Sequence, residues 1–185
     1  MDNDSKPGLI ERLAALLLGM PGDRGQLAEI LRGAYERNLM DADALAIIEG
    51  ALAASETRVI DVMVPRALMD VVDINEPMAR IIPVVIEAAH SRFPVIDGDR
   101  DHVLGVMLAK DLLRMHVEAD FDLRASLRPV VFIPESKRLN VLLREFRVSR
   151  NHMAIVVNEY GSVAGLVTIE DVLEQIVGDI EDEYD

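Results

Sequence analysis

The chain has 185 residues, which allows one domain or two small ones, and 50% of them are hydrophobic, which argues against general disorder. With 33 acidic and 19 basic residues its formal net charge is −14, a field that disfavours non-specific binding to nucleic acid or anionic lipid. There is no cysteine, which excludes disulfides, thiol catalysis and thiolate metal sites.

Residues 1–56 are predicted to form a helical N-terminal segment. Apolar residues recur at helical spacing in residues 7–20, a second helix is predicted at about 26–38, and Asp41 or Asp43 would cap a third. The most apolar early run, residues 13–20, is far shorter than the roughly 20 residues of a membrane span and lacks the basic start of a signal peptide. We therefore expect a cytoplasmic protein without membrane insertion.

From residue 57 onward, short apolar runs alternate with helical patterns in the order β-α-β-β-α, and this order occurs twice. The first set is predicted at residues 69–73, 77–89, 93–96, 103–107 and 109–115, and the second at 129–133, 136–147, 153–157, 163–167 and 169–177. We place the first repeat at residues 57–120, the second at 121–180 and an acidic tail at 181–185.

The two repeats align residue by residue. The aligned pairs are Val95 with Ile155, Ile96 with Val156, Val103 with Val163, Gly105 with Gly165, and Asp111 with Asp171. A matched succession of this length indicates a duplication.

The end of the second repeat offers a candidate site and also a simpler explanation. Thr168 and Asp171 have the spacing of a capping box at a helix start. The first repeat keeps Asp111 but has Leu108 in place of the hydroxyl, so a capping box does not account for Asp111. A favourable interaction with the helix dipole remains an alternative explanation for that aspartate.

Four longer stretches resemble one protein family. They are SETRVIDVMVPR at residues 55–66, HSRFPVI at 90–96, PESKRLNVLLREF at 134–146, and NHMAIVVNEYGSVAGLVTIEDVLEQIVGDIEDE at 151–183. With the repeated Gly-h-h-[Ser/Thr]-x-x-Asp pattern, where h is hydrophobic, residues 44–185 resemble the CorC family of magnesium and cobalt efflux proteins, which carry paired cystathionine-β-synthase (CBS) domains. The resemblance implies an α+β fold with tandem β-α-β-β-α CBS repeats in a pseudo-twofold pair.

The chain departs from this family at both ends. Larger relatives carry a membrane domain before the CBS pair, whereas this chain has short helices there. Family members usually continue into a small C-terminal domain, whereas this chain ends at Asp185.

The resemblance also implies an adenine-nucleotide site for AMP or ATP. In such sites the aspartate accepts hydrogen bonds from ribose hydroxyls, the hydroxyl contacts ribose or phosphate, and the helix N-terminus faces the anion. Thr168 and Asp171 would form the complete site, with Asp111 marking a degenerate one. Glu170 is the candidate for a Mg²⁺ ion that accompanies ATP.

The rest of the pocket would come from the other repeat. Next to Thr57, the side chains of Ile60 and Val62 would sandwich the adenine, although ordinary core packing explains them equally well. His90, Ser91 and Arg92, in the loop that enters the middle strand, would complete this adenine slot, with Arg92 or His90 near a phosphate. His152, at the equivalent place in the second repeat, is a further candidate for phosphate contact. For these the alternative is a solvated or structural side chain.

Catalysis finds little support, because there is no P-loop, HExxH motif or nucleophile elbow and only 4 histidines. We expect a nucleotide-binding regulatory module for magnesium and cobalt efflux rather than an enzyme, with no metal site of its own. It would form a homodimer, and a membrane ion transporter is its candidate partner. The alternatives are a structural dimerisation module with a vestigial pocket and, more distantly, a hydrolase with an unrecognised site.

Overall fold

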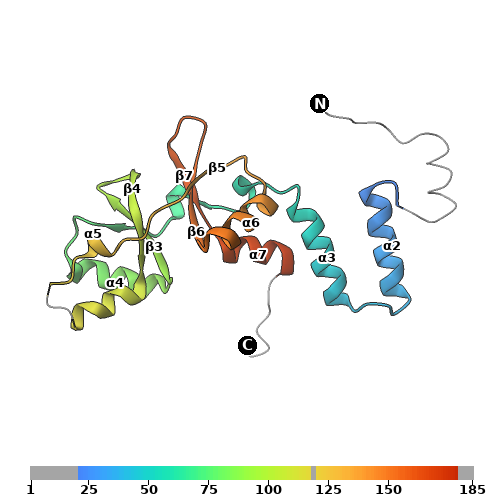
Figure 1. Cartoon of the computed structure of the whole chain (residues 1–185), viewed down its shortest axis with the longest axis horizontal. Coiled ribbons are helices and arrows are strands. Elements are labelled where there is room, and N and C mark those ends of the chain that lie inside the picture. Colours follow the sequence, from blue (N-terminus) through green and yellow to red (C-terminus); the bar gives the residue numbers. More distant parts are fainter. Residues whose placement is uncertain (1–20, 118–119, 179–185) are drawn as a thin grey trace. The chain divides into compact units, whose positions relative to one another are not determined.

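The computed structural model describes residues 21–117 and 120–178. The chain divides into two compact units, one made of Met1–Leu52 with Ile176–Asp185 and the other of Ala53–Gln175. The elements of both can be followed in Figure 1. The helix predicted in residues 7–20 and the acidic tail at 181–185 lie outside the described residues.

The first unit contains two helices that the sequence predicts, α2 (Arg24–Glu36) and α3 (Ala42–Ala54). Asp41 caps α3, because its Oδ1 accepts a hydrogen bond from the backbone N–H of Ala44 at 2.7 Å. Of the two candidate caps, Asp41 is therefore the one used. No helix in residues 21–117 and 120–178 combines the length and the apolar character needed to cross a membrane.

The second unit contains both β-α-β-β-α repeats, which confirms the predicted α+β fold. A lead-in segment carries the 3₁₀ helix η1 (Val59–Asp61), β1 (Val64–Pro65) and the 3₁₀ helix η2 (Arg66–Leu68). The first repeat then has β2 (Val72–Asp73), α4 (Met78–Ala88), β3 (Arg92–Asp97), β4 (Asp99–Leu108) and the 3₁₀ helix η3 (Ala109–His116). The second has α5 (Leu123–Ser126), β5 (Phe132–Pro134), α6 (Leu139–Ser149), β6 (Met153–Val157), β7 (Val163–Thr168) and α7 (Ile169–Val177).

The strands form one sheet for each repeat, and the second sheet borrows a strand. The order is β2-β3-β4 in the first sheet and β1-β7-β6-β5 in the second. β1 lies before the first repeat in the sequence, yet Val64 pairs with Leu166 and Pro65 with Gly165 of β7. The segment that leads into the first repeat therefore completes the sheet of the second.

The predicted alignment of the middle strands was wrong by one residue. Val95 pairs with Gly105, and Val156 pairs with Gly165, so Val95 corresponds to Val156 and not to Ile155. Likewise Ile96 corresponds to Val157 and not to Val156, because they pair with Val103 and Val163. The hairpin of the first repeat holds one more residue than that of the second. Both middle strands are continuous apolar runs, and such runs carry no alternation that fixes a register.

Three groups of buried side chains hold the second unit together. One packs against the sheet of the first repeat and includes Val72, Ile81, Val85, Phe93, Val95 and Met107, joined by Leu123 of α5 from the second repeat. Another lies within the second and includes Ile133, Leu139, Leu142, Phe146, Val156, Val167 and Val172. The third draws on both sheets and consists of Met69, Ile96, Val103, Val106, Met153, Ile155, Val163 and Leu166. This shared core joins the repeats into one body.

The repeated glycines allow two backbones to approach closely. A Cβ atom at Gly165 would lie 2.3 Å from the carbonyl oxygen of Val64, and one at Gly105 would lie 2.7 Å from that of Arg128. Backbone atoms cannot move aside as a flexible side chain can, so both positions require glycine. The glycines that mark the duplication are thus explained by packing without any ligand.

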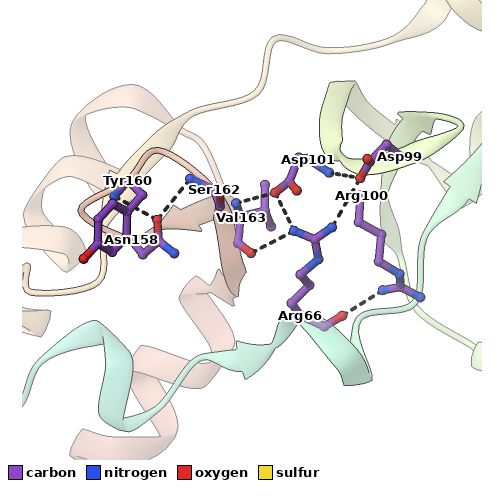
Figure 2. A network of polar contacts seen from close by, with 8 residues as sticks. All are labelled: Arg66, Asp99, Arg100, Asp101, Asn158, Tyr160, Ser162 and Val163. Atoms are coloured by element: carbon purple, nitrogen blue, oxygen red, sulfur yellow. Dashed lines mark hydrogen bonds and ion pairs between the residues drawn. The ribbon is translucent and has the colours of Figure 1, made fainter.

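A polar network around Arg66 links the two repeats (Figure 2). The Arg66 guanidinium donates to Asp101 Oδ1 and, at 3.2 Å, to Asp99 Oδ1 at the start of β4. The same Asp101 oxygen accepts a hydrogen bond from the backbone N–H of Val163 in β7 at 2.7 Å. The hydrogen bonds from Arg66 and Val163 lower the pKa of the Asp101 carboxyl.

Candidate functional site

A cavity of about 410 Å³ lies between the two repeats of the second unit. Its walls come from β1 and the segment after it, the loop into β3 with the first residue of that strand, the strands β6 and β7, and the start of α7. The lining residues are Val64, Leu68, Asp70, Ala89, His90, Ser91, Arg92, Met153, Leu166, Thr168, Glu170 and Asp171. The volume lies within the range of ordinary small-molecule pockets.

Thr168 and Asp171 form a capping box at the start of α7. Oδ2 of Asp171 accepts hydrogen bonds from the backbone N–H of Thr168 at 2.6 Å and from its hydroxyl at 2.7 Å. The backbone N–H of Asp171 in turn donates to Thr168 Oγ1 at 3.2 Å. Within the described part of the chain, the other carboxylate oxygen, Oδ1, accepts no hydrogen bond. Capping therefore uses one oxygen of this carboxylate, Oδ2, and leaves Oδ1 available at the cavity.

Charged side chains of both signs surround the same cavity. Arg92 Nη1, at the start of β3, lies 3.8 Å from Glu170 Oε1 in the first turn of α7. His152 Nδ1 lies 3.7 Å from the same oxygen. His90 Nε2 lies 3.1 Å from Asp70 Oδ2. The site thus has one guanidinium and two imidazoles near the place for an anion, each beside a carboxylate that would compete for them.

One wall of the cavity is apolar. Val64 and Leu68 come from the lead-in segment, and Met153 and Leu166 come from the sheet of the second repeat. Leu68 is 71% exposed, although it is a large hydrophobic residue. A flat apolar ligand group would cover part of this surface.

Sequence reasoning found the polar residues of the cavity except Asp70, and it missed the apolar wall. The predicted residues that line it are His90, Ser91, Arg92, Thr168, Glu170 and Asp171. His152 is not among the lining residues but contacts one of them, Glu170. Val64 would have been found if the pairing of its strand with Gly165 had been recognised, whereas nothing in the sequence marks Leu68.

Three predicted residues lie elsewhere, against the second repeat. The Thr57 carbonyl accepts a hydrogen bond from the backbone N–H of Leu139 at 3.0 Å, and the Ile60 N–H donates to the Glu135 carbonyl at 3.0 Å. Val62 packs on the core of the second repeat. These residues do not line the cavity, and for Val62 core packing, the alternative explanation, is what the structure shows.

Asp111 occupies the matching position in the first repeat but is enclosed. It is only 5% exposed, and both of its oxygens accept hydrogen bonds from the guanidinium of Arg128, one of them at 3.3 Å. Among residues 21–117 and 120–178, no three His, Asp or Glu side chains converge as a metal site.

Comparison with known proteins places the chain in a wider group. A family model for the CBS domain matches residues 122–178, and a model for the N-terminal region of NMB0537 matches residues 19–54. The magnesium and cobalt efflux protein CorC of Vibrio cholerae is 46% identical over 186 residues, covering 100% of this chain and 64% of that protein. The chain therefore spans less than two thirds of the length of this relative.

Solved structures resemble the chain along most of its length. A conserved domain of unknown function from Neisseria meningitidis is 48% identical, with a TM-score of 0.76 over 80% of this chain and 97% of that one. The CBS domain of a bacterial CNNM/CorC family Mg²⁺ transporter in complex with ATP is 39% identical, with a TM-score of 0.67 over 72% of this chain and 96% of that one. A CBS-domain pair with bound AMP from Klebsiella pneumoniae is 29% identical, with a TM-score of 0.59 over 66% of this chain and 99% of that one.

Proposed function

The chain belongs to the CNNM/CorC family and contains its CBS-domain pair, and from this premise we propose that it is a regulatory module that binds AMP or ATP in magnesium and cobalt homeostasis. The observation that carries the proposal is the cavity between the repeats, where an apolar wall lies next to an aspartate with an open acceptor oxygen. An adenosine has the same two parts, an apolar ring and a vicinal diol.

We assign the parts of the nucleotide to the parts of the cavity by their chemistry. The adenine lies on the apolar wall of Val64, Leu68, Met153 and Leu166. The ribose hydroxyls donate to Asp171, whose Oδ1 is available, and contact the hydroxyl of Thr168. The phosphates face the N-terminus of α7 and Arg92, where backbone N–H groups and a guanidinium stabilise an anion. Similar CBS domains are known in complex with ATP and with AMP, which supports this assignment.

Magnesium would enter this site with ATP rather than alone. The chain carries a formal net charge of −14, and Glu170 already lies beside Arg92 and His152. A triphosphate therefore meets an acidic field and a carboxylate that competes with it for Arg92 and His152. Mg²⁺ prefers phosphate oxygens, water and one or two carboxylates, and it would turn Glu170 from a competitor into a partner.

The mechanism of regulation follows from the position of the cavity. Both repeats contribute lining residues, so a nucleotide that binds there favours one relative arrangement of the pair. The size of the effect equals the difference in affinity between the arrangements. The partner that senses the arrangement is a membrane ion transporter, which the chain contacts from the cytoplasm. The chain regulates without catalysing a reaction.

The proposal is tested by calorimetric titration with AMP, ADP and ATP, with and without Mg²⁺. We expect AMP to bind with little dependence on Mg²⁺, and ATP affinity to rise with millimolar Mg²⁺. If ATP affinity is unchanged or lowered by Mg²⁺, AMP is the better candidate ligand. If no nucleotide binds, a structural dimerisation module is the better description. Product analysis of the same samples tests for hydrolysis.

We also propose that the chain forms a homodimer through its exposed helix faces. Several large hydrophobic side chains on the helices of both repeats are more than 40% exposed, namely Val84, Ile86, Leu113, Val141, Val148 and Leu173. Exposed apolar patches of this kind usually mark interfaces. A twofold dimer would bury the same faces on both copies.

A further inference from the structure

The sheet of the first repeat contacts a structural counterpart of Val64, namely Arg128 in the segment that leads into β5. Val64 pairs with Leu166 in β7, and Arg128 forms the matching bridge with Val106 in β4. The carbonyl oxygens of Val64 and Arg128 lie against the repeated glycines, Gly165 and Gly105. Val64 and Arg128 are therefore equivalent in the two halves of the pair.

The side chains at these equivalent positions differ in whether they leave the motif aspartate accessible. Val64 is short and apolar, and it lines the cavity that contains Asp171. Arg128 instead reaches Asp111, the motif aspartate of the first repeat, and donates hydrogen bonds to both of its carboxylate oxygens. Its Nη1 also donates to the carbonyl of Ser126 at 2.7 Å, which fixes the guanidinium in this place.

We propose that Arg128 is a built-in occupant of the first-repeat site and so limits the chain to one nucleotide. The inference rests on the proposed function, because it concerns the second copy of the same kind of site. A guanidinium presents parallel N–H donors to a carboxylate, as a vicinal diol presents its two hydroxyls. The two cannot bind Asp111 at the same time, and Arg128 is attached to the chain, so no ribose displaces it at ordinary concentrations.

Leu108, which has no hydroxyl, explains why Asp111 needs Arg128 as a hydrogen-bond donor. In the second repeat, the Thr168 backbone and hydroxyl donate to Asp171 and satisfy one of its oxygens. The equivalent Leu108 has no hydroxyl, and Asp111 is only 5% exposed. A buried carboxylate without a donor is strongly destabilising, so the loss of the hydroxyl and the presence of Arg128 belong together.

The test restores the residues of the second repeat in the first. In the Leu108→Thr/Arg128→Val variant, the threonine would donate a hydrogen bond to Asp111, and the valine would open the space beside it. Calorimetry with AMP, and with ATP plus Mg²⁺, should give one nucleotide per natural chain and two per variant chain. In an Asp171→Ala background, where the second-repeat site binds only weakly, the same pair of substitutions should add one site with an affinity like that of the natural chain.

Matched variants separate the possible failures. Arg128→Val/Asp111→Asn removes the guanidinium and the charge together, so it should fold and still bind only one nucleotide. A natural chain that binds two nucleotides, or a folded Leu108→Thr/Arg128→Val chain that still binds one, would overturn the inference and leave the proposed function intact. If the natural chain and the variant both bind nothing, the proposed function fails. Thermal melting by circular dichroism establishes that each variant is folded, and Arg128→Val alone should melt lowest because it leaves Asp111 without a donor.

Discussion

Asp171 caps α7 through one carboxylate oxygen, and in the proposed site its other oxygen accepts a hydrogen bond from the ligand. We predict that Asp171→Ala weakens AMP binding by about 1.5–3 kcal/mol, because a hydrogen bond to a charged group is lost. Loss of the cap should also lower the stability by about 1 kcal/mol. Thr168→Ala should weaken binding less, since its hydroxyl is neutral. Calorimetry and thermal melting of the same samples measure the two effects separately.

Asp111→Ala is the control for this prediction. It changes the same motif position in the other repeat, where Arg128 already occupies both carboxylate oxygens. The variant should lose stability and keep its affinity for AMP. If Asp111→Ala abolishes binding while Asp171→Ala leaves it intact, the nucleotide belongs to the first repeat.

For single residues, the sequence predicts those roles that depend on neighbours close by in the chain. The spacing of Thr168 and Asp171 marks a helix start, and both residues do line the cavity. The roles of Val64 and Arg128 depend on a strand and a bridge formed with residues far along the chain. A single sequence contains no local pattern for such contacts, so neither role could be predicted.

Among the elements, β7 relies on a single glycine for its contact with β1. Gly165→Ala would place a Cβ atom 2.3 Å from the Val64 carbonyl oxygen, so β1 and β7 would have to separate. We predict a loss of about 1–3 kcal/mol of stability, as for other overpacked positions. Thermal or urea unfolding followed by circular dichroism measures it.

Gly33 offers the matched control on α2. A Cβ atom there would meet nothing within 4 Å, and alanine is favoured over glycine in a helix by about 1 kcal/mol. Gly33→Ala should therefore be neutral or stabilising. A Gly165→Ala chain as stable as the natural one would show that β1 is not held against β7.

Helices were easier to predict than strand partners. The bounds of α7 agree with the prediction, because its apolar residues recur at helical spacing after a clear cap. The two-residue strand β1 has no periodicity to detect, and its exchange into the other sheet went unpredicted. The error of one residue in the alignment of β3 with β6 has the same origin, since a continuous apolar run fits either register.

In the molecule as a whole, the Arg66 network should make stability sensitive to acid. The Asp101 carboxyl has a lowered pKa in the folded state, so its contribution is present above the ordinary aspartate pKa of about 3.9 and is lost as the pH falls below it. We predict that the melting temperature of Asp101→Asn falls less between pH 5 and pH 3 than that of the natural chain. Equal losses in the two chains would show that this pair contributes nothing.

The homodimer is the second prediction at this scale. Light scattering at micromolar concentration should give twice the chain mass of 20.5 kDa. Ile86→Glu places a charge on α4 at a side chain that is 71% exposed, and it should shift the protein toward monomer. Tyr160→Glu changes an exposed residue on the β6–β7 turn, outside the helices, and should leave the dimer intact. A monomer mass for the natural chain would contradict the proposal.

The exchange of β1 into the second sheet also bears on how the protein is made. The first repeat emerges early from the ribosome during synthesis, and β2, β3 and β4 can pair as soon as residues 72–108 have emerged. The second sheet needs β1, which emerges first, and β7, which emerges almost last. Until then β1 has no partner strand, and closing so long a loop is slow. A gene fragment cut between the repeats would therefore not encode two independent halves, because the second half would lack a strand that only the first half supplies.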